Sequence, residues 1–389
     1  MTPSPSASIQ GYPRIIALDV LRGATVVFML LVNNPGDWSH VYGPLLHAPW
    51  HGWTPTDFIF PFFLWIVGVS AVLSLRRRLQ QGVSANDLSL FVLRRVFILL
   101  ALGLFLSAFP FGLILNHTFS LSSMRFPGVL QRIALCYWAA GWLIIHTNPR
   151  TQITIILVLI IGYGLLLTQI PVPGFGAGIL LPRGNWAWYV DSSLLSGHTW
   201  SGAPVPGFDP EGIVSTFAAV ATTLLGGMTG HFLLSSHSQR NKVILMMVGG
   251  GGLVALGVIL DQWWLPINKN LWTSSYVVFT AGVATVVLAL AYGGLDILGI
   301  KRWSMLFVYC GQNAIALFVL SGLVGRLLIL IKRVSPENKV ISLKAFLFQN
   351  YFLPYFDPQL ASFLFALVFT LLMGLLAFAI YRMNWIIKV

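Results

Sequence analysis

Charged residues are scarce in this sequence. Asp, Glu, Lys and Arg make up only 9% of the 389 residues, whereas 57% are hydrophobic, and the mean hydropathy is +0.81. A soluble domain carries roughly a quarter charged residues. The composition therefore excludes a soluble globular protein and predicts an all-α, polytopic membrane helix bundle formed by a single domain, residues 1–389.

Cysteine and acidic residues are also few. Cys136 and Cys310 fall in apolar runs, so they predict small core side chains and no disulfide framework. Basic residues outnumber acidic ones 23 to 11. In a membrane protein this excess reflects Lys and Arg on the cytoplasmic side, and a site for a polyanionic ligand is a second contribution that stays open. We expect membrane lipids and no nucleic acid as partners.

Long hydrophobic runs recur along the whole chain. A spanning helix needs about 20 mostly apolar residues. Ten segments qualify: 16–34, 57–75, 91–109, 128–146, 152–170, 212–234, 243–261, 272–293, 304–322 and 359–381. The first dozen residues are polar and rich in Ser and Pro, unlike a cleavable signal peptide, so the first span is expected to be an uncleaved anchor.

Basic residues predict the orientation of these spans. Arginines at 76–78 and 94–95 flank the link between the second and third spans, which indicates that this link is cytoplasmic. Alternation then puts both termini in the cytoplasm. The outer face receives the segments 35–56, 110–127, 171–211, 262–271 and 323–358.

Two of the outer segments are long. Residues 171–211 are rich in Gly, Pro and Trp, and we expect a packed, lid-like loop with Trp186, Trp188 and Tyr189 at the membrane interface. The connection 323–358 carries basic residues that do not fit the orientation. Within it, residues 323–331 predict an amphipathic interfacial helix.

The stretch LLHAPWHGWTPTDFIFPFF (45–63) places His47 and His51 ahead of Asp57. A neutral imidazole is the natural general base near neutral pH, and a carboxylate within reach fixes its tautomer. The alternatives are an ordinary hydrogen-bonded histidine and a metal site. We expect no metal, because no acidic or cysteine cluster supports one and the spacings fit no standard site.

Further polar residues lie in or beside the spans, where they are costly and therefore informative. Asp19 and Arg22 share a helix face at spacing i, i+3, as a structural ion pair or part of a binding site. Asn33, near the outer end of the same span, either caps the helix or offers its amide to a ligand. Asp209 and Glu211 precede the sixth span and either cap it or bind a sugar.

A last polar group, with Asn268 and Lys269, precedes the eighth span on the outer side. If this group meets the histidines and the acidic pair, the three build a pocket that combines a base, carboxylates, amides and indoles. Such a pocket suits a hydroxylated or amino-sugar acceptor, with Trp50 available to contact the sugar face.

Seven blocks of the sequence resemble, in order and spacing, the family of heparan-α-glucosaminide N-acetyltransferases and their bacterial relatives. The blocks are LDVLRG (18–23), LVNNPG (31–36), HAPWHGWTPTDFIFPFFLWIVG (47–68), RFPGVLQRIALCY (125–137), FDPEGIVST (208–216), PINKNLWTSSY (266–276) and GQNAI (311–315). The resemblance implies a polytopic enzyme that uses cytoplasmic acetyl-CoA to acetylate an amino sugar on the far side of the membrane.

The resemblance also implies roles for single residues. The family's active histidine corresponds to His47, its neighbouring amide to Asn33 and its aspartate to Asp57. His51 is a departure, because Asn is expected there in relatives. The residues expected to bind the acceptor are Trp50, Asp209, Glu211, Asn268 and Lys269.

CoA carries several negative charges, which keep its nucleotide end in the cytoplasm. We therefore expect the basic residues Arg22, Arg94 and Arg95 to bind it. Arg132, in the fourth span, is a candidate for stabilising buried CoA groups or a developing oxyanion, or for pairing with a carboxylate.

Two mechanisms and two other classes of protein stay open. His47 either removes a proton from the attacking acceptor or takes the acetyl group first and passes it on. A sugar transporter is the alternative to an enzyme, and a membrane scaffold is a third class. The choice between N- and O-acetylation and a homodimeric state also stay open. The compact chain leads us to expect a bacterial inner (plasma) membrane.

Overall fold

The computed structural model describes residues 14–112, 119–335 and 338–383. The polar start of the chain and part of the outer segment 110–127 lie outside these residues. The α-helices are α1 Ile16–Asn33, α2 Ile59–Gln80, α3 Ala85–Ala108, α4 Val129–His146, α5 Pro149–Gln169, α6 Trp186–Leu194, α7 Ile213–Leu233, α8 Gln239–Trp263, α9 Ser274–Ala291, α10 Met305–Gln312, α11 Ala314–Leu330, α12 Leu343–Tyr351 and α13 Pro358–Arg382. A π-helix, Tyr292–Ile297, continues α9.

The described residues contain nine helices long and apolar enough to cross a membrane, and ten spans if α10 and α11 count as one. This confirms the predicted all-α polytopic bundle. The nine straight spans fall on nine of the ten predicted segments, with ends that differ by up to six residues.

The predicted ninth span, 304–322, falls on two helices joined by a bend. Helices α10 and α11 meet at Asn313 with a bend of 72°. The predicted interfacial helix at 323–331 is wrong, because residues up to Leu330 continue α11. The rest of the outer connection forms a short hairpin, β1 Lys332–Val334 paired antiparallel with β2 Val340–Ser342, and then α12.

Short polar side chains set where several helices begin. Ser84 accepts a hydrogen bond from the backbone N–H of Asp87 at the start of α3. Asn148 caps α5 in the same way, and the residue that follows it is a proline at the first helical position. These caps satisfy N–H groups that have no partner within the helix.

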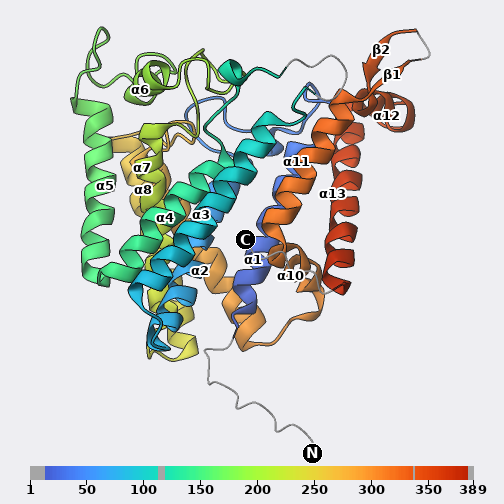
Figure 1. Cartoon of the computed structure of the whole chain (residues 1–389). Coiled ribbons are helices and arrows are strands. Elements are labelled where there is room, and N and C mark those ends of the chain that lie inside the picture. The colour runs from blue at the N-terminus through green and yellow to red at the C-terminus, as the bar shows by residue number, and fades with distance from the viewer. Residues whose placement is uncertain (1–13, 113–118, 336–337, 384–389) are drawn as a thin grey trace, which may run out of the picture.

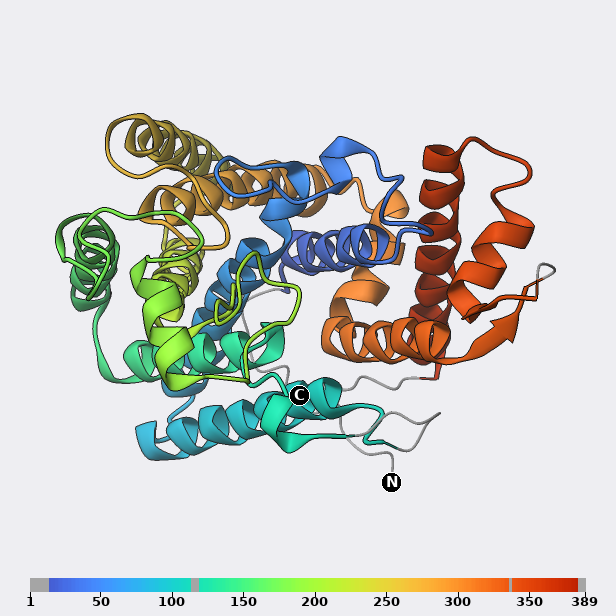
Figure 2. The same ribbon diagram turned by 90° about the horizontal axis from the view of Figure 1, so that it is seen from above.

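The spans pack into two groups around α1 and α2 (Figures 1 and 2). Helices α5, α7, α8 and α9 lie on one side, and α10, α11 and α13 lie on the other. The loop after α1, the segment around α6, the hairpin and α12 all lie at the upper end of the bundle in Figure 1. The segments predicted to share the outer face therefore share one end of the molecule.

Helices α1 and α10 approach unusually closely. A Cβ atom built on Gly23 would lie 1.7 Å from the backbone oxygen of Phe307, and one built on Gly311 would lie 2.2 Å from that of Asp19. Only glycine permits backbones to meet at this distance. The contact fixes the first half of the bent span against α1.

Candidate active site

Asp57 is held by a capping box immediately before α2. Residues Pro55–Phe58 form a 3-10 helix with Thr54 as its N-cap. Oδ2 of Asp57 accepts hydrogen bonds from the backbone N–H groups of Thr54, at 2.9 Å, and Ala48, at 3.1 Å. The Tyr276 hydroxyl donates to the Asp57 carbonyl oxygen at 2.5 Å. The side chain of Asp57 is only 1% exposed, so the local sequence TPTD fixes a buried carboxylate in one orientation.

His47 lies against this carboxylate. Its Nδ1 is 2.7 Å from Oδ1 of Asp57, and its side chain is 47% exposed. The carboxylate favours the tautomer in which Nδ1 carries the proton and donates to Asp57. Nε2 is then the unprotonated ring nitrogen, as a general base requires. The structure thus brings together the two residues that the sequence paired.

Lys269 covers the imidazole of His47. Its Nζ lies 3.1 Å from both Nδ1 and Nε2, and 3.9 Å from Oδ1 of Asp57. The lone pairs of the two ring nitrogens point in different directions, so an ammonium equidistant from both lies over the ring face. Burial lowers the pKa of Lys269, although Asp57 and Glu211 act to raise it.

The other histidine of the stretch contacts the same loop. Nδ1 of His51 lies 3.3 Å from the side-chain nitrogen of Asn268. The backbone N–H of Gly52 donates to the Ile267 carbonyl at 2.7 Å. Burial lowers the pKa of His51. The structure therefore brings the histidine stretch into contact with the loop before α9, which the sequence left as a condition.

Arg125 organises the acidic pair before α7. Its Nε and Nη2 donate to the two carboxylate oxygens of Asp209 at 2.8 and 2.5 Å, and Nη2 also donates to Glu211. Burial alone would lower the pKa of Arg125, but the hydrogen bonds that it donates to Asp209 and the negative charge of Glu211 raise that pKa above its usual value. Burial alone would likewise raise the pKa of Glu211, but Arg125, Arg132 and Lys269 hold it below its usual value.

Neither member of that acidic pair caps α7, so the capping alternative is wrong. The N-cap residue is Gly212, and Asp191 of α6 accepts the hydrogen bond from the Ile213 N–H at 2.9 Å. Burial raises the pKa of Asp191 to about 7. The N-cap residue Gly212 has no side chain that could accept a hydrogen bond, so Asp191 of α6 accepts one at the start of α7 instead.

Trp50 ties this segment to the histidine stretch. Its indole N–H donates to the Leu180 carbonyl at 2.8 Å, and its ring packs edge-on against Phe208 at 5.5 Å between centroids. The segment that lies at the upper end of the bundle in Figure 1 therefore contacts Trp50 of the histidine stretch through Leu180, and Asp209 of the acidic pair through the backbone N–H of Trp200.

Arg132 is buried on the same side, not with the other predicted CoA residues. It donates to the Gly212 carbonyl at 3.1 Å and to the Ser215 hydroxyl, and its guanidinium lies 5.1 Å from the ring centre of Trp272. Its Nε and Nη1 have no hydrogen-bond partner among the described residues. A buried guanidinium with free N–H groups is available to stabilise negative charge near Glu211.

Arg22 and Arg95 lie toward the opposite end. Arg22 pairs with Asp19 at 3.3 Å, which confirms the predicted contact, and donates to Ser70 at 2.7 Å. Arg95 stacks on Tyr137 at 4.8 Å, and its buried Nε has no partner among the described residues. Arg22 and Arg95 interact electrostatically, whereas Arg94 is exposed.

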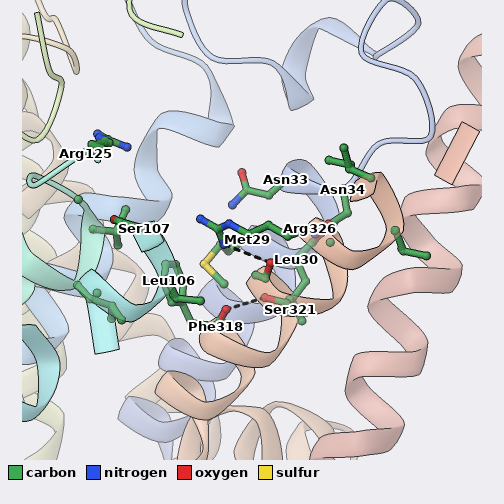
Figure 3. A pocket seen from close by; sticks show the side chains of 18 of the residues that line it. Met29, Leu30, Asn33, Asn34, Leu106, Ser107, Arg125, Phe318, Ser321 and Arg326 are labelled. Atoms are coloured by element: carbon green, nitrogen blue, oxygen red, sulfur yellow. Dashed lines mark hydrogen bonds between the residues drawn. The ribbon is translucent and has the colours of Figure 1, made fainter. Parts of the chain in front are cut away.

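Asn33 faces a cavity of about 510 Å³ between α1, α3, α4 and α11 (Figure 3). Neither His47 nor Asp57 lines it. Arg125 lines the cavity and also binds Glu211, which acts on Lys269 beside His47. The cavity and the base are therefore joined by a chain of charged residues. Asn33 does not cap α1, because the amide of Asn34 donates to the Leu30 carbonyl instead.

Sequence reasoning missed Arg125 and Asp191 as partners in the site. Both are distant along the chain from the groups they bind, by 84 residues for Arg125 and Asp209. The only available signal for Arg125 was its place in the block RFPGVLQRIALCY. Among the described residues no cluster of three or more His, Cys, Asp or Glu side chains is arranged to hold a metal.

Comparison with known proteins relates this arrangement to a family. Residues 14–267, more than half of the chain, match the family described as heparan-alpha-glucosaminide N-acetyltransferase, catalytic. The chain belongs to the heparan-α-glucosaminide N-acetyltransferase family. The matched residues include His47, Asp57, Arg125 and Glu211.

Two curated members of the heparan-α-glucosaminide N-acetyltransferase family are similar over most of the chain. The heparan-alpha-glucosaminide N-acetyltransferase of Homo sapiens is 28% identical over 359 residues, which cover 79% of this chain and 52% of the human protein. That of Mus musculus is 27% identical over 358 residues, covering 79% and 53%. The chain thus spans about half the length of these two relatives.

Proposed function

We propose that this protein transfers an acetyl group from cytoplasmic acetyl-CoA to the amine of a glucosamine-type sugar on the outer side of the membrane. The observation that carries the proposal is the His47–Asp57 pair, with Nδ1 of the exposed imidazole 2.7 Å from a buried carboxylate oxygen. The family membership supports the reaction class, because both similar proteins are named as glucosaminide N-acetyltransferases.

His47 acts as the general base. Acetyl-CoA supplies the acetyl group as an activated thioester. Nε2 of His47 takes the proton from the sugar amine as the nitrogen forms its bond to the acetyl carbon, and the carbon–sulfur bond breaks. The proton leaves with the thiolate as free thiol. Asp57 orients the imidazole and stabilises its positive charge while it holds that proton.

Glu211 is assigned to attracting the acceptor amine, because it is the more exposed member of the acidic pair. Lys269 and Asn268 lie beside the two histidines, within reach of a sugar bound there. Trp50 and Asp209 support the acceptor indirectly, because each is held by protein groups, the Leu180 carbonyl and Arg125. This arrangement favours nitrogen over a hydroxyl oxygen as the atom acetylated, since carboxylates attract the ammonium form of the sugar, which releases one proton to solvent before the neutral amine attacks.

The donor's nucleotide end is assigned to the end of the bundle that carries Arg22, Arg94 and Arg95. The buried Nε of Arg95 without a partner supports this, because a phosphate oxygen would satisfy it. At the outer end, Asn33 is assigned to the acetyl carbonyl or the acceptor. Arg132 is assigned to negative charge that develops during transfer.

A two-step route through acetyl-His47 is the mechanistic alternative. The two routes differ in whether CoA is released in the absence of an acceptor: the two-step route releases it, and direct transfer does not. A stoichiometric burst of free thiol from the protein and acetyl-CoA alone would identify it. Direct transfer predicts thiol release only when glucosamine is present.

A transporter is the second candidate function, and the 72° break between α10 and α11 is the observation that favours it. Proteoliposomes separate the two. With acetyl-CoA inside and glucosamine outside, an acetyltransferase returns external sugar heavier by one acetyl group. A transporter carries unmodified sugar inward and needs no acetyl-CoA. Unmodified uptake without any acetylated product would refute the proposed function.

Three further features belong to the same proposal. The protein resides in a bacterial inner (plasma) membrane with both termini in the cytoplasm. Residues 171–211 form the lid of the outer site. Two copies form a homodimer, which a mass measurement of the purified protein in detergent would test.

A further inference from the structure

The cavity beside Asn33 is lined by three basic side chains and by no carboxylate among the described residues. The cations are Arg125, Arg326 and Lys344. Figure 3 shows Arg326 and Asn33 directed into the same space from α11 and α1. At about 510 Å³ the cavity falls within the range of small-molecule sites, roughly 300–1,000 Å³.

Two of these cations lack an ionic partner among the described residues. Arg125 is neutralised by Asp209 and Glu211. Within the described part of the chain, Arg326 donates only to the Gly322 carbonyl of its own helix, at 3.2 Å. Lys344 forms no ion pair with any described residue. Asp37 acts on it electrostatically, but that carboxylate is 2.7 Å from His40. Burial lowers the pKa of Lys344, which shows that its charge is poorly solvated.

A half-buried, unpaired guanidinium in a spanning helix is costly and points to a ligand. The planar fork of Arg326 and the ammonium of Lys344 match a carboxylate or phosphate group. Asn33 and Ser321 add hydrogen-bonding groups to the same wall. The neutral part of the ligand would lie against Met29 and Phe318.

We propose that this cavity binds an anionic group of the acceptor, so that the preferred substrate is an amino sugar bearing a phosphate or carboxylate. This inference rests on the proposed function, because it names the class of acceptor for that site. The cavity is formed by the outer ends of α1 and α3 and the start of α4, at the same end as His47. CoA's phosphates are assigned to the opposite end, which leaves these cations for the acceptor.

The test compares glucosamine with glucosamine 6-phosphate as ligands of the purified full-length protein in detergent. We expect wild type to bind the phosphorylated sugar about ten- to a hundredfold more tightly, the range of one or two charge-assisted hydrogen bonds. Arg326→Gln and Lys344→Gln should each reduce that ratio, and Arg326→Lys should retain part of it. Lys332→Gln removes an exposed cation outside the cavity and should leave the ratio unchanged.

Equal binding of both sugars by wild type, or a ratio unchanged in Arg326→Gln, would overturn the inference. So would a variant that weakens binding of coenzyme A or of phosphatidylglycerol but not the sugar ratio, because the cavity would then hold CoA or a lipid headgroup. Binding is read without turnover. A preference for the phosphorylated sugar that Arg326→Gln abolishes therefore supports the anion site even if no acetylated product forms, in which case only the proposed function fails.

Discussion

Asp57 and Asp37 both lie 2.7 Å from Nδ1 of a histidine, but they differ in burial. The side chain of Asp57, beside His47, is 1% exposed, and that of Asp37, beside His40, is 36% exposed. A buried carboxylate interacts with its partner in a lower effective dielectric, so it orients and polarises the imidazole more strongly. The two pairs offer a matched comparison within one chain.

Asp57→Asn should reduce the rate of acetyl transfer by about 10²–10⁴-fold, because an amide neither favours the required tautomer nor stabilises the charged ring. Asp37→Asn should leave the rate close to that of wild type. Initial rates of thiol release with acetyl-CoA and glucosamine measure both. Equal losses in the two variants would contradict a specific role for the buried pair.

Arg125→Gln should destabilise the protein, because it leaves Asp209 and Glu211 buried without their cation. Removing one partner of a buried ion pair costs about 3–5 kcal/mol. Thermal unfolding of the purified protein in detergent should show a clearly lower midpoint. Adding Asp209→Asn to Arg125→Gln should recover part of the loss, and a double variant less stable than the single one would argue against this pairing.

Stability should depend on the titration of Asp191, whose pKa burial raises to about 7. The usual carboxyl pKa of Asp is about 3.9, so between these values the folded protein binds more protons than the unfolded chain. Stability should therefore fall as the pH rises from about 4 to about 7.

Asp191→Asn keeps an oxygen for the Ile213 N–H and removes the charge. The variant should be more stable than wild type above neutral pH and should lose this part of the pH dependence. Unfolding midpoints between pH 5 and 8 provide the readout, with the exposed Asp87→Asn as control. A pH dependence that persists in Asp191→Asn would assign it to another group.

Gly23→Ala should disrupt the contact between α1 and α10, because the added Cβ would overlap the Phe307 backbone oxygen. Overpacking of this kind typically costs about 1–3 kcal/mol, and backbone cannot move aside as a side chain can. Gly249→Ala is the matched control, since no atom lies within 4 Å of its Cβ position. A Gly23→Ala protein as stable as Gly249→Ala would show that α1 and α10 accommodate the added Cβ without a loss of stability, which would contradict this prediction.

The sequence was sufficient to predict most spans and the His47–Asp57 pair. The spans can be predicted because the bilayer requires a fixed length of apolar residues. The His47–Asp57 pair can be predicted because its two members are only ten residues apart in the sequence. The bend at Asn313 was not predicted, because residues 304–322 are apolar enough for one span despite Gln312 and Asn313, and apolar content does not report direction. The partners of Asp209 and Glu211 were missed for a related reason: an ion pair with Arg125 depends on how α4 and α7 pack, which no local pattern encodes.

We propose that His47, and not His51, is the base. The most direct test is kcat/KM for glucosamine, with acetyl-CoA as donor, in wild type, His47→Ala and His51→Ala. We expect a loss of at least about 10²-fold in His47→Ala and a value near wild type in His51→Ala. A His47→Ala protein that acetylates glucosamine at the wild-type rate, or a loss confined to His51→Ala, would contradict it.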